Sequence, residues 1–209
     1  MSHYDDEAQM EQLRRWWKEN RMALAGGLVL GLGGIFGWEA WQSAQTGKAE
    51  QASQIYEDLK KVTASKPEQA AELGKTLMQD FSSTPYAAQA ALLLAQKAVD
   101  RADWAPAEAQ LKWVIENADD AGFKKIARLR LARVFWQQNK PEDALKQLDL
   151  KDDDAFASLF QELRGDIKLS QNDREAAREA YEKALTLGPA PASRELLQRK
   201  VDDLTGAQS

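Results

Sequence analysis

Few residues in this chain have the types and spacing that catalysis or metal binding requires. The sequence contains no cysteine and a single histidine, His3. A cysteine nucleophile, a thiolate metal site and an Fe–S cluster are therefore excluded, and no Ser-His-Asp triad or multi-histidine metal site can form in the body of the chain. The sequence also has no Gly-rich phosphate loop and no nucleophile elbow. We therefore predict a protein without enzymatic activity and without a cofactor.

The densest group of carboxylates is the run Asp152, Asp153 and Asp154. A calcium loop would require a central glycine and a glutamate at its twelfth position, and neither is present. Because carboxylates stabilise the first turn of a helix, we interpret this run as the N-terminal cap of a helix over 155–170.

One predicted helix carries a cluster of basic residues: Lys124, Lys125, Arg128, Arg130 and Arg133. A nucleic-acid site would need a basic domain with stacking aromatic residues, whereas the net charge of this chain is −5. We interpret the cluster as a solvated face that pairs with neighbouring acidic helices, and we exclude nucleic acid as a partner.

The composition indicates which elements position these groups. Among 209 residues there are 34 Ala and 25 Leu, against 6 Val, 5 Ile and 6 Thr. Strands favour the β-branched residues and helices favour Ala and Leu, so an all-α fold is predicted.

An apolar run of 17 residues without a charge, Met22 to Trp38, lies near the N-terminus. Four of the seven tryptophans bracket it: Trp16, Trp17, Trp38 and Trp41. Trp17 and Trp38 are 21 residues apart, which at ~1.5 Å per residue is roughly 32 Å of helix, close to the ~30 Å thickness of a hydrocarbon core. This pattern predicts a single transmembrane helix over 22–41 with interfacial tryptophans at both ends.

The flanking charges predict the orientation of this helix. Arg14, Arg15, Lys18 and Arg21 precede the run, and Lys48 alone follows within a comparable distance. The positive-inside rule therefore predicts a cytoplasmic segment over 1–21 and a domain over 42–209 on the opposite side of the membrane. A cleaved signal peptide ending at Ala44 is the alternative, although Gln42 would then occupy a position that favours a small side chain.

Small residues recur every four positions within the predicted span: Ala23, Gly27 and Gly31, and separately Gly33 and Gly37. Such spacing lets a second helix approach closely in lipid, so we hypothesise that these residues pack against another membrane helix. The alternative is that glycine is simply frequent in membrane helices.

The domain over 42–209 contains helical segments with a repeated spacing of small and large residues. The three units are Ala95, Ala107 and Leu111; Ala132, Ala144 and Leu148; and Gly165, Ala177 and Tyr181. Ala132 lies 37 residues after Ala95, and Gly165 lies 33 residues after Ala132, against ~34 for a tetratricopeptide (TPR) repeat. We predict a TPR-like α-solenoid capped by an amphipathic helix over 193–204. Ala-rich helical hairpins of other kinds share part of the pattern.

In this register the first helix of each repeat lines a concave groove. The predicted groove residues are Gln96, Arg133, Trp136, Glu162 and Asp166. Glu162 and Asp166 would favour a partner with basic and apolar character. The alternative is that Trp136 belongs to the core and that Arg133 bridges to the next helix.

The whole arrangement resembles the YfgM family of bacterial inner-membrane TPR proteins. The resemblance rests on the Gly-rich span ending in G-W-E-A-W, on T-P-Y-A-A-Q-A-A-L-L-L-A-Q from Thr84 to Gln96, and on L-R-L-A-R-V from Leu129 to Val134. It implies a single-pass inner-membrane protein with a periplasmic TPR domain, an ancillary subunit of the SecYEG translocon. It also implies hand-over of exported client proteins to periplasmic chaperones, with the membrane-anchored chaperone PpiD as a partner. The alternative function is an envelope scaffold or regulator that binds a signalling or cell-wall component.

Overall fold

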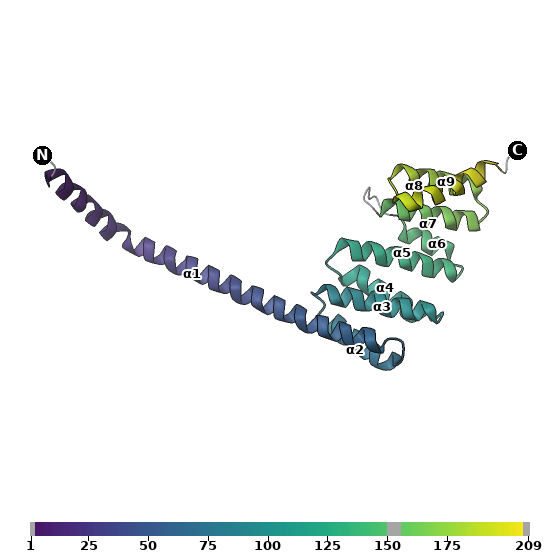
Figure 1. The fold of residues 1–209 in the computed structure, drawn as a ribbon, viewed down its shortest axis with the longest axis horizontal. Coiled ribbons are helices and arrows are strands. Elements are labelled where there is room, and N and C mark those ends of the chain that lie inside the picture. Colours follow the sequence, from purple (N-terminus) through teal and green to yellow (C-terminus); the bar gives the residue numbers. More distant parts are fainter. Residues whose placement is uncertain (1–2, 150–155, 207–209) are drawn as a thin grey trace. The chain divides into compact units, whose positions relative to one another are not determined.

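The computed structural model describes residues 3–149 and 156–206, and within these ranges it consists of nine α-helices without a strand (Figure 1). The helices are α1 (His3–Val62), α2 (Pro67–Asp80), α3 (Pro85–Asp100), α4 (Trp104–Asn117), α5 (Ala121–Gln137), α6 (Pro141–Gln147), α7 (Ala157–Ser170), α8 (Arg174–Thr186) and α9 (Pro191–Gly206). The predicted all-α class is thus confirmed for the described residues. The chain divides into two compact units, Met1–Glu50 and Gln51–Ser209.

The first unit contains the N-terminal part of α1, and this helix continues past the predicted span to Val62. The tryptophans on either side of the apolar run are exposed, and the rings of Trp38 and Trp41 lie 5.1 Å apart. By length, hydropathy and charge, no single helix in the described part of the chain qualifies as a membrane span. Two consecutive stretches of α1, Leu13–Ala23 and Ala25–Val62, are bent by 44° relative to each other. Taken together, these two stretches do qualify as a possible membrane span.

The second unit is a stack of helical hairpins. α3 packs against α4, α5 against α6 and α7 against α8, while α4 also contacts α5 and α9 contacts α8. Proline occupies the first turn of α2, α3 and α6, where its missing N–H costs no helical hydrogen bond. The turns inside the three hairpins each contain one residue with positive φ, namely Ala102 (55°), Asn139 (58°) and Asn172 (63°).

The repeat register predicted from the small residues agrees with the packing. Ala95, Ala107, Ala132, Ala144 and Ala177 are each at most 1% exposed. The large residues that follow them, Leu111, Leu148 and Tyr181, are 1% exposed as well. Small side chains allow the two helices of a hairpin to approach closely, and the large side chain fills the space beside them.

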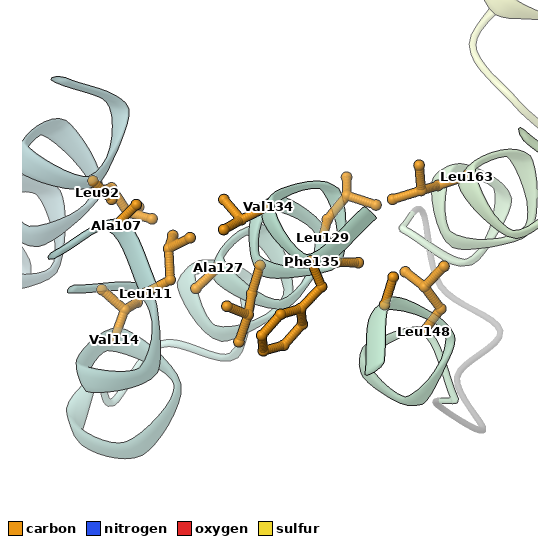
Figure 2. Close-up of a cluster of buried hydrophobic side chains, with 14 of the residues drawn as sticks. Leu92, Ala107, Leu111, Val114, Ala127, Leu129, Val134, Phe135, Leu148 and Leu163 are labelled. Carbon is orange, nitrogen blue, oxygen red and sulfur yellow. The ribbon is translucent and has the colours of Figure 1, made fainter. Parts of the chain in front are cut away.

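The central core runs continuously from the first repeat to the third (Figure 2). Leu92 and Leu111 come from the first hairpin, Val134 and Leu148 from the second, and Leu163 from the third. Because neighbouring hairpins share this core, each hairpin buries an apolar face that would be exposed to water if the hairpin were isolated.

A further hairpin, which the repeat spacing did not predict, precedes these three. The end of α1 and α2 bury Ala52, Leu59, Ala70 and Leu77 in one cluster together with Ala90 of α3. This hairpin lacks the small residue twelve positions before Ala70, where the exposed Asp58 lies instead.

Candidate functional site

A pocket of about 330 Å³ lies between the first helices of the first two repeats, α3 and α5. Gln96 and Val99 line it from α3, and Arg130, Arg133, Val134 and Gln137 line it from α5. Two of the predicted groove residues, Gln96 and Arg133, therefore lie at one site.

Helical spacing brings these side chains to a common surface. Arg130, Arg133 and Gln137 follow each other at intervals of three and four residues, which places them on one side of α5. The buried Ala95 and Ala132 hold α3 and α5 in their hairpins, so the positions of both walls are determined by the core rather than by loops.

The pocket carries uncompensated positive charge. Arg130 is half-buried, and its Nη1 donates to the carbonyl oxygen of Leu92 at 3.4 Å. Arg133 is exposed, and no ion pair or hydrogen bond of its side chain is found among the described residues. Among the described residues, no carboxylate lines the pocket.

The acid that contacts the lining residue Gln96 is already paired. Nε2 of Gln96 donates to Oδ1 of Asp100 at 2.9 Å, and Nζ of Lys97 donates to Oδ2 of Asp100 at 3.1 Å. These two hydrogen bonds lower the pKa of Asp100. The carboxylate of Asp100 thus stays ionised with Lys97 as its counter-ion, and the two arginines keep their charge available to a ligand.

Trp136 lies outside this pocket. Its half-buried indole packs against the central core, and Nε1 donates to Oγ of Ser170 at 3.0 Å. The side chain therefore connects the end of α5 to the end of α7.

Glu162 and Asp166 lie together on α7, where both carboxylates contact Lys200 of α9. Nζ of Lys200 lies 3.0 Å from Oε1 of Glu162 and 2.7 Å from Oδ1 of Asp166. The hydroxyl of Tyr181 donates to the same Asp166 oxygen at 2.7 Å, and the Lys200 ammonium lies 5.1 Å from the Tyr181 ring centroid. Burial lowers the pKa of Lys200, but the hydrogen bonds to Asp166 and Glu162 outweigh it and raise the pKa overall. Burial, and then the Asp166 carboxylate, raise the pKa of Tyr181.

The cation that we expected from a partner is thus supplied by the terminal helix itself. Lys200 contacts both acids from within the fold and neutralises one of their two negative charges, and its side chain is 25% exposed. The amphipathic pattern over 193–204 predicted a capping helix but not this contact, because the pattern does not specify which charged residue of α9 lies against α7.

The remaining predicted residues lie in α1 and, along the sequence, between α6 and α7. A Cβ atom built on Gly27, Gly31, Gly33 or Gly37 would contact nothing within 4 Å, and Ala23 is exposed. The small residues of the predicted span therefore have no packing partner among the described residues. The predicted capping run Asp152–Asp154 lies outside those residues. Where the chain is described, no group of three His, Asp or Glu side chains is arranged to hold a metal ion.

Comparison with known proteins agrees with the repeat architecture. A family model described as a tetratricopeptide repeat-like domain matches residues 14–206. No solved structure matches the chain at a significant level.

Characterised relatives match over nearly the full length. The chain is 35% identical to the "Ancillary SecYEG translocon subunit" of Escherichia coli, with 98% of this chain and 100% of the relative covered. Proteins of the same name from Haemophilus influenzae (32% identity, 96% and 98% covered) and Neisseria gonorrhoeae (31%, 97% and 99%) are similar to it as well. The chain therefore belongs to the YfgM family of ancillary SecYEG translocon subunits, which carry a TPR-like domain.

Proposed function

We propose that this protein is a membrane-anchored adaptor of the SecYEG translocon, which holds a TPR-like domain beside chains that emerge from the channel in the periplasm. The proposal rests mainly on the near full-length similarity to ancillary translocon subunits. In this function the second unit receives exported proteins and passes them to periplasmic chaperones, among which PpiD is the expected partner.

The N-terminal unit supports the anchoring part of the proposal. Its apolar run is bracketed by exposed tryptophans, and its glycines leave open surface on which a second helix can pack. An isolated helix with this composition in water would expose its leucines and tryptophans, which a bilayer would cover instead. We propose that residues 22–41 cross the inner membrane once, with 1–21 in the cytoplasm and 42–209 in the periplasm.

Co-purification tests the association with the translocon. A tagged full-length chain, extracted from membranes in mild detergent, should retain SecY, SecE and SecG. Absence of all three subunits would contradict the proposal and favour the alternative of an envelope scaffold or regulator.

A pair of single substitutions tests the contact made by the span. Gly31→Leu should reduce the recovered translocon subunits, because a large side chain keeps a second helix at a distance. Ala25→Leu, which places the same leucine side chain on a different side of the helix, should leave the recovery unchanged. An equal effect of both substitutions would show that the small residues do not form the contact.

Protease accessibility tests the topology. Protease added to spheroplasts should digest residues 42–209 and leave an N-terminal tag protected. Protection of the C-terminal domain in intact spheroplasts, with digestion only after lysis, would reverse the proposed orientation.

A further inference from the structure

We propose that the pocket between α3 and α5 binds an extended polypeptide segment in which an acidic side chain stands next to an apolar one. The proposal rests on the function proposed above, since it specifies which segments of an exported protein the TPR-like domain would hold. It reverses the expectation from the sequence that the groove selects basic segments.

Charge complementarity is the first argument. The lining presents two guanidinium groups, Arg130 and Arg133, and no carboxylate. The acids expected to attract a cation, Glu162 and Asp166, already share Lys200 at 3.0 Å and 2.7 Å. Because Arg130, Arg133 and Lys200 carry three positive charges against the two acids, these groups are positive overall, and arginine binds carboxylates through directional, charge-assisted hydrogen bonds.

The shape of the pocket supplies the second argument. Val99 and Val134 provide apolar surface beside the arginines, while Gln96 and Gln137 add amide groups that can bond to a peptide backbone. A volume of about 330 Å³ lies at the lower end of the ~300–1,000 Å³ found for ligand pockets. This is enough for one or two side chains, whereas an α-helix with a diameter of ~10–12 Å would not enter it.

The position of the pocket supplies the third argument. Its walls are the first helices of successive hairpins, and solenoids use the surface formed by such repeated elements to bind extended partners. Arg133, which has no partner among the described residues, follows Ala132 directly, so the buried core residue of the second repeat fixes the backbone from which the arginine projects.

Peptide binding to the purified full-length protein in detergent tests the proposal. The probe is a fluorescein-labelled octapeptide with a central Asp-Leu-Asp, acetylated and amidated so that neither terminus is charged. Fluorescence anisotropy should show at least tenfold tighter binding of this peptide than of its Asn-Leu-Asn counterpart, because one charge-assisted hydrogen bond corresponds to about tenfold in affinity.

Three variants assign the binding to the pocket. Arg133→Gln should weaken the binding of the Asp-Leu-Asp peptide about tenfold. Arg133→Glu should shift the binding preference to a Lys-Leu-Lys peptide. The control Arg128→Gln removes the same charge from the same helix outside the pocket and should change the affinity less than twofold. Arg133 is exposed, so all melting temperatures should stay near that of the parent.

The proposal is overturned if the Asn peptide binds as tightly as the Asp peptide, or if Arg128→Gln and Arg133→Gln weaken binding equally. It is also overturned if inorganic phosphate displaces the peptide at an equal concentration, which would indicate a general anion site. The assay contains no translocon. A failure here therefore concerns the pocket, whereas a failure of co-purification concerns the proposed function.

Discussion

The replacement Gly165→Ala should destabilise the third repeat, although alanine is normally the better residue inside a helix. Gly165 is buried on α7, opposite Tyr181 of α8. A Cβ atom at position 165 would lie within 2.9 Å of three carbons of the Tyr181 ring, which is closer than side chains tolerate. The ring cannot rotate away freely, because its hydroxyl donates to Asp166 and the Lys200 ammonium lies 5.1 Å from the ring centroid.

Two opposing terms determine the size of the effect. Inserting a methyl group into a packed site costs ~1–3 kcal/mol, and the three close ring contacts place this site near the upper end. The gain in helix propensity from glycine to alanine returns about 1 kcal/mol. The free energy of unfolding should therefore fall by about 2 kcal/mol, which corresponds to a decrease in melting temperature of roughly 4–8 °C for a domain of this size.

Gly74→Ala serves as the matched control. Its added Cβ would also overlap a neighbour, but that neighbour is the terminal methyl group of Leu94, a flexible and half-buried side chain. Leu94 can move by a rotamer change, so the helix propensity gain should compensate most of the cost. Thermal unfolding of the full-length protein followed by circular dichroism should show a much smaller shift than for Gly165→Ala.

A double variant tests the cause of the destabilisation. In the first two repeats the equivalent positions hold a buried alanine and a buried leucine, as in Ala132 and Leu148. Combining Gly165→Ala with Tyr181→Leu should therefore cost about 1–2 kcal/mol less than the sum of the single variants. Purely additive effects, or a Gly165→Ala protein as stable as its parent, would refute the explanation that the ring excludes a side chain at position 165.

Three further substitutions address the packing, the ion cluster and one turn. Ala177→Leu, at a fully buried position, should lower the free energy of unfolding by ~1–3 kcal/mol, and an unchanged melting temperature would contradict the repeat register. Lys200→Met leaves Glu162 and Asp166 without their cation and should cost about 1–2 kcal/mol at neutral pH. The pKa of Lys200 is raised above 10.5, so its contribution to the free energy of unfolding is complete below pH 10.5 and is lost as the pH rises through the pKa of the folded state. The difference in melting temperature between the parent and Lys200→Met should therefore narrow at that alkaline pH. A difference that stays constant with pH would exclude the ion cluster as its cause. Ala102→Gly should raise the stability by about 1 kcal/mol, since Ala102 has φ of 55°, and a loss of stability would show that the turn is not strained.

The spacing of small residues along the chain predicted the positions at which the two helices of one hairpin pack closely, because these positions require a small side-chain volume. Ala132 and Ala144, or Gly165 and Ala177, must be small because two helices cross there, and this demand recurs at a fixed interval. The hairpin formed by the end of α1 and by α2 was not predicted, because its buried Leu59 and Ala70 do not follow the twelve-residue interval between small residues.

Contacts between the third repeat and its neighbouring elements could not be predicted from the sequence for a different reason. The Trp136–Ser170 hydrogen bond and the contact of Lys200 with Asp166 each join residues 34 positions apart. Whether such residues meet depends on the angle between neighbouring hairpins, and the amphipathic pattern of a single helix contains no information about that angle. The pattern identifies which residues are polar, but it does not identify their partners.

This distinction decides what the groove can recognise. Counting the predicted groove residues gives two acids, Glu162 and Asp166, against one cation, Arg133, which suggests a basic ligand. Contacts inside the fold change the result, because Lys200 neutralises one charge of the acidic pair, while Arg133 has no partner among the described residues and lines the pocket with a second cation, Arg130. A compensated carboxylate attracts a ligand cation weakly, since the ligand must displace an ammonium group that is already desolvated and in place. An unpaired arginine on an apolar surface has no such competitor. The ligand preference of this domain therefore follows from which charges are left unpaired, and this depends on how α9 packs against α7.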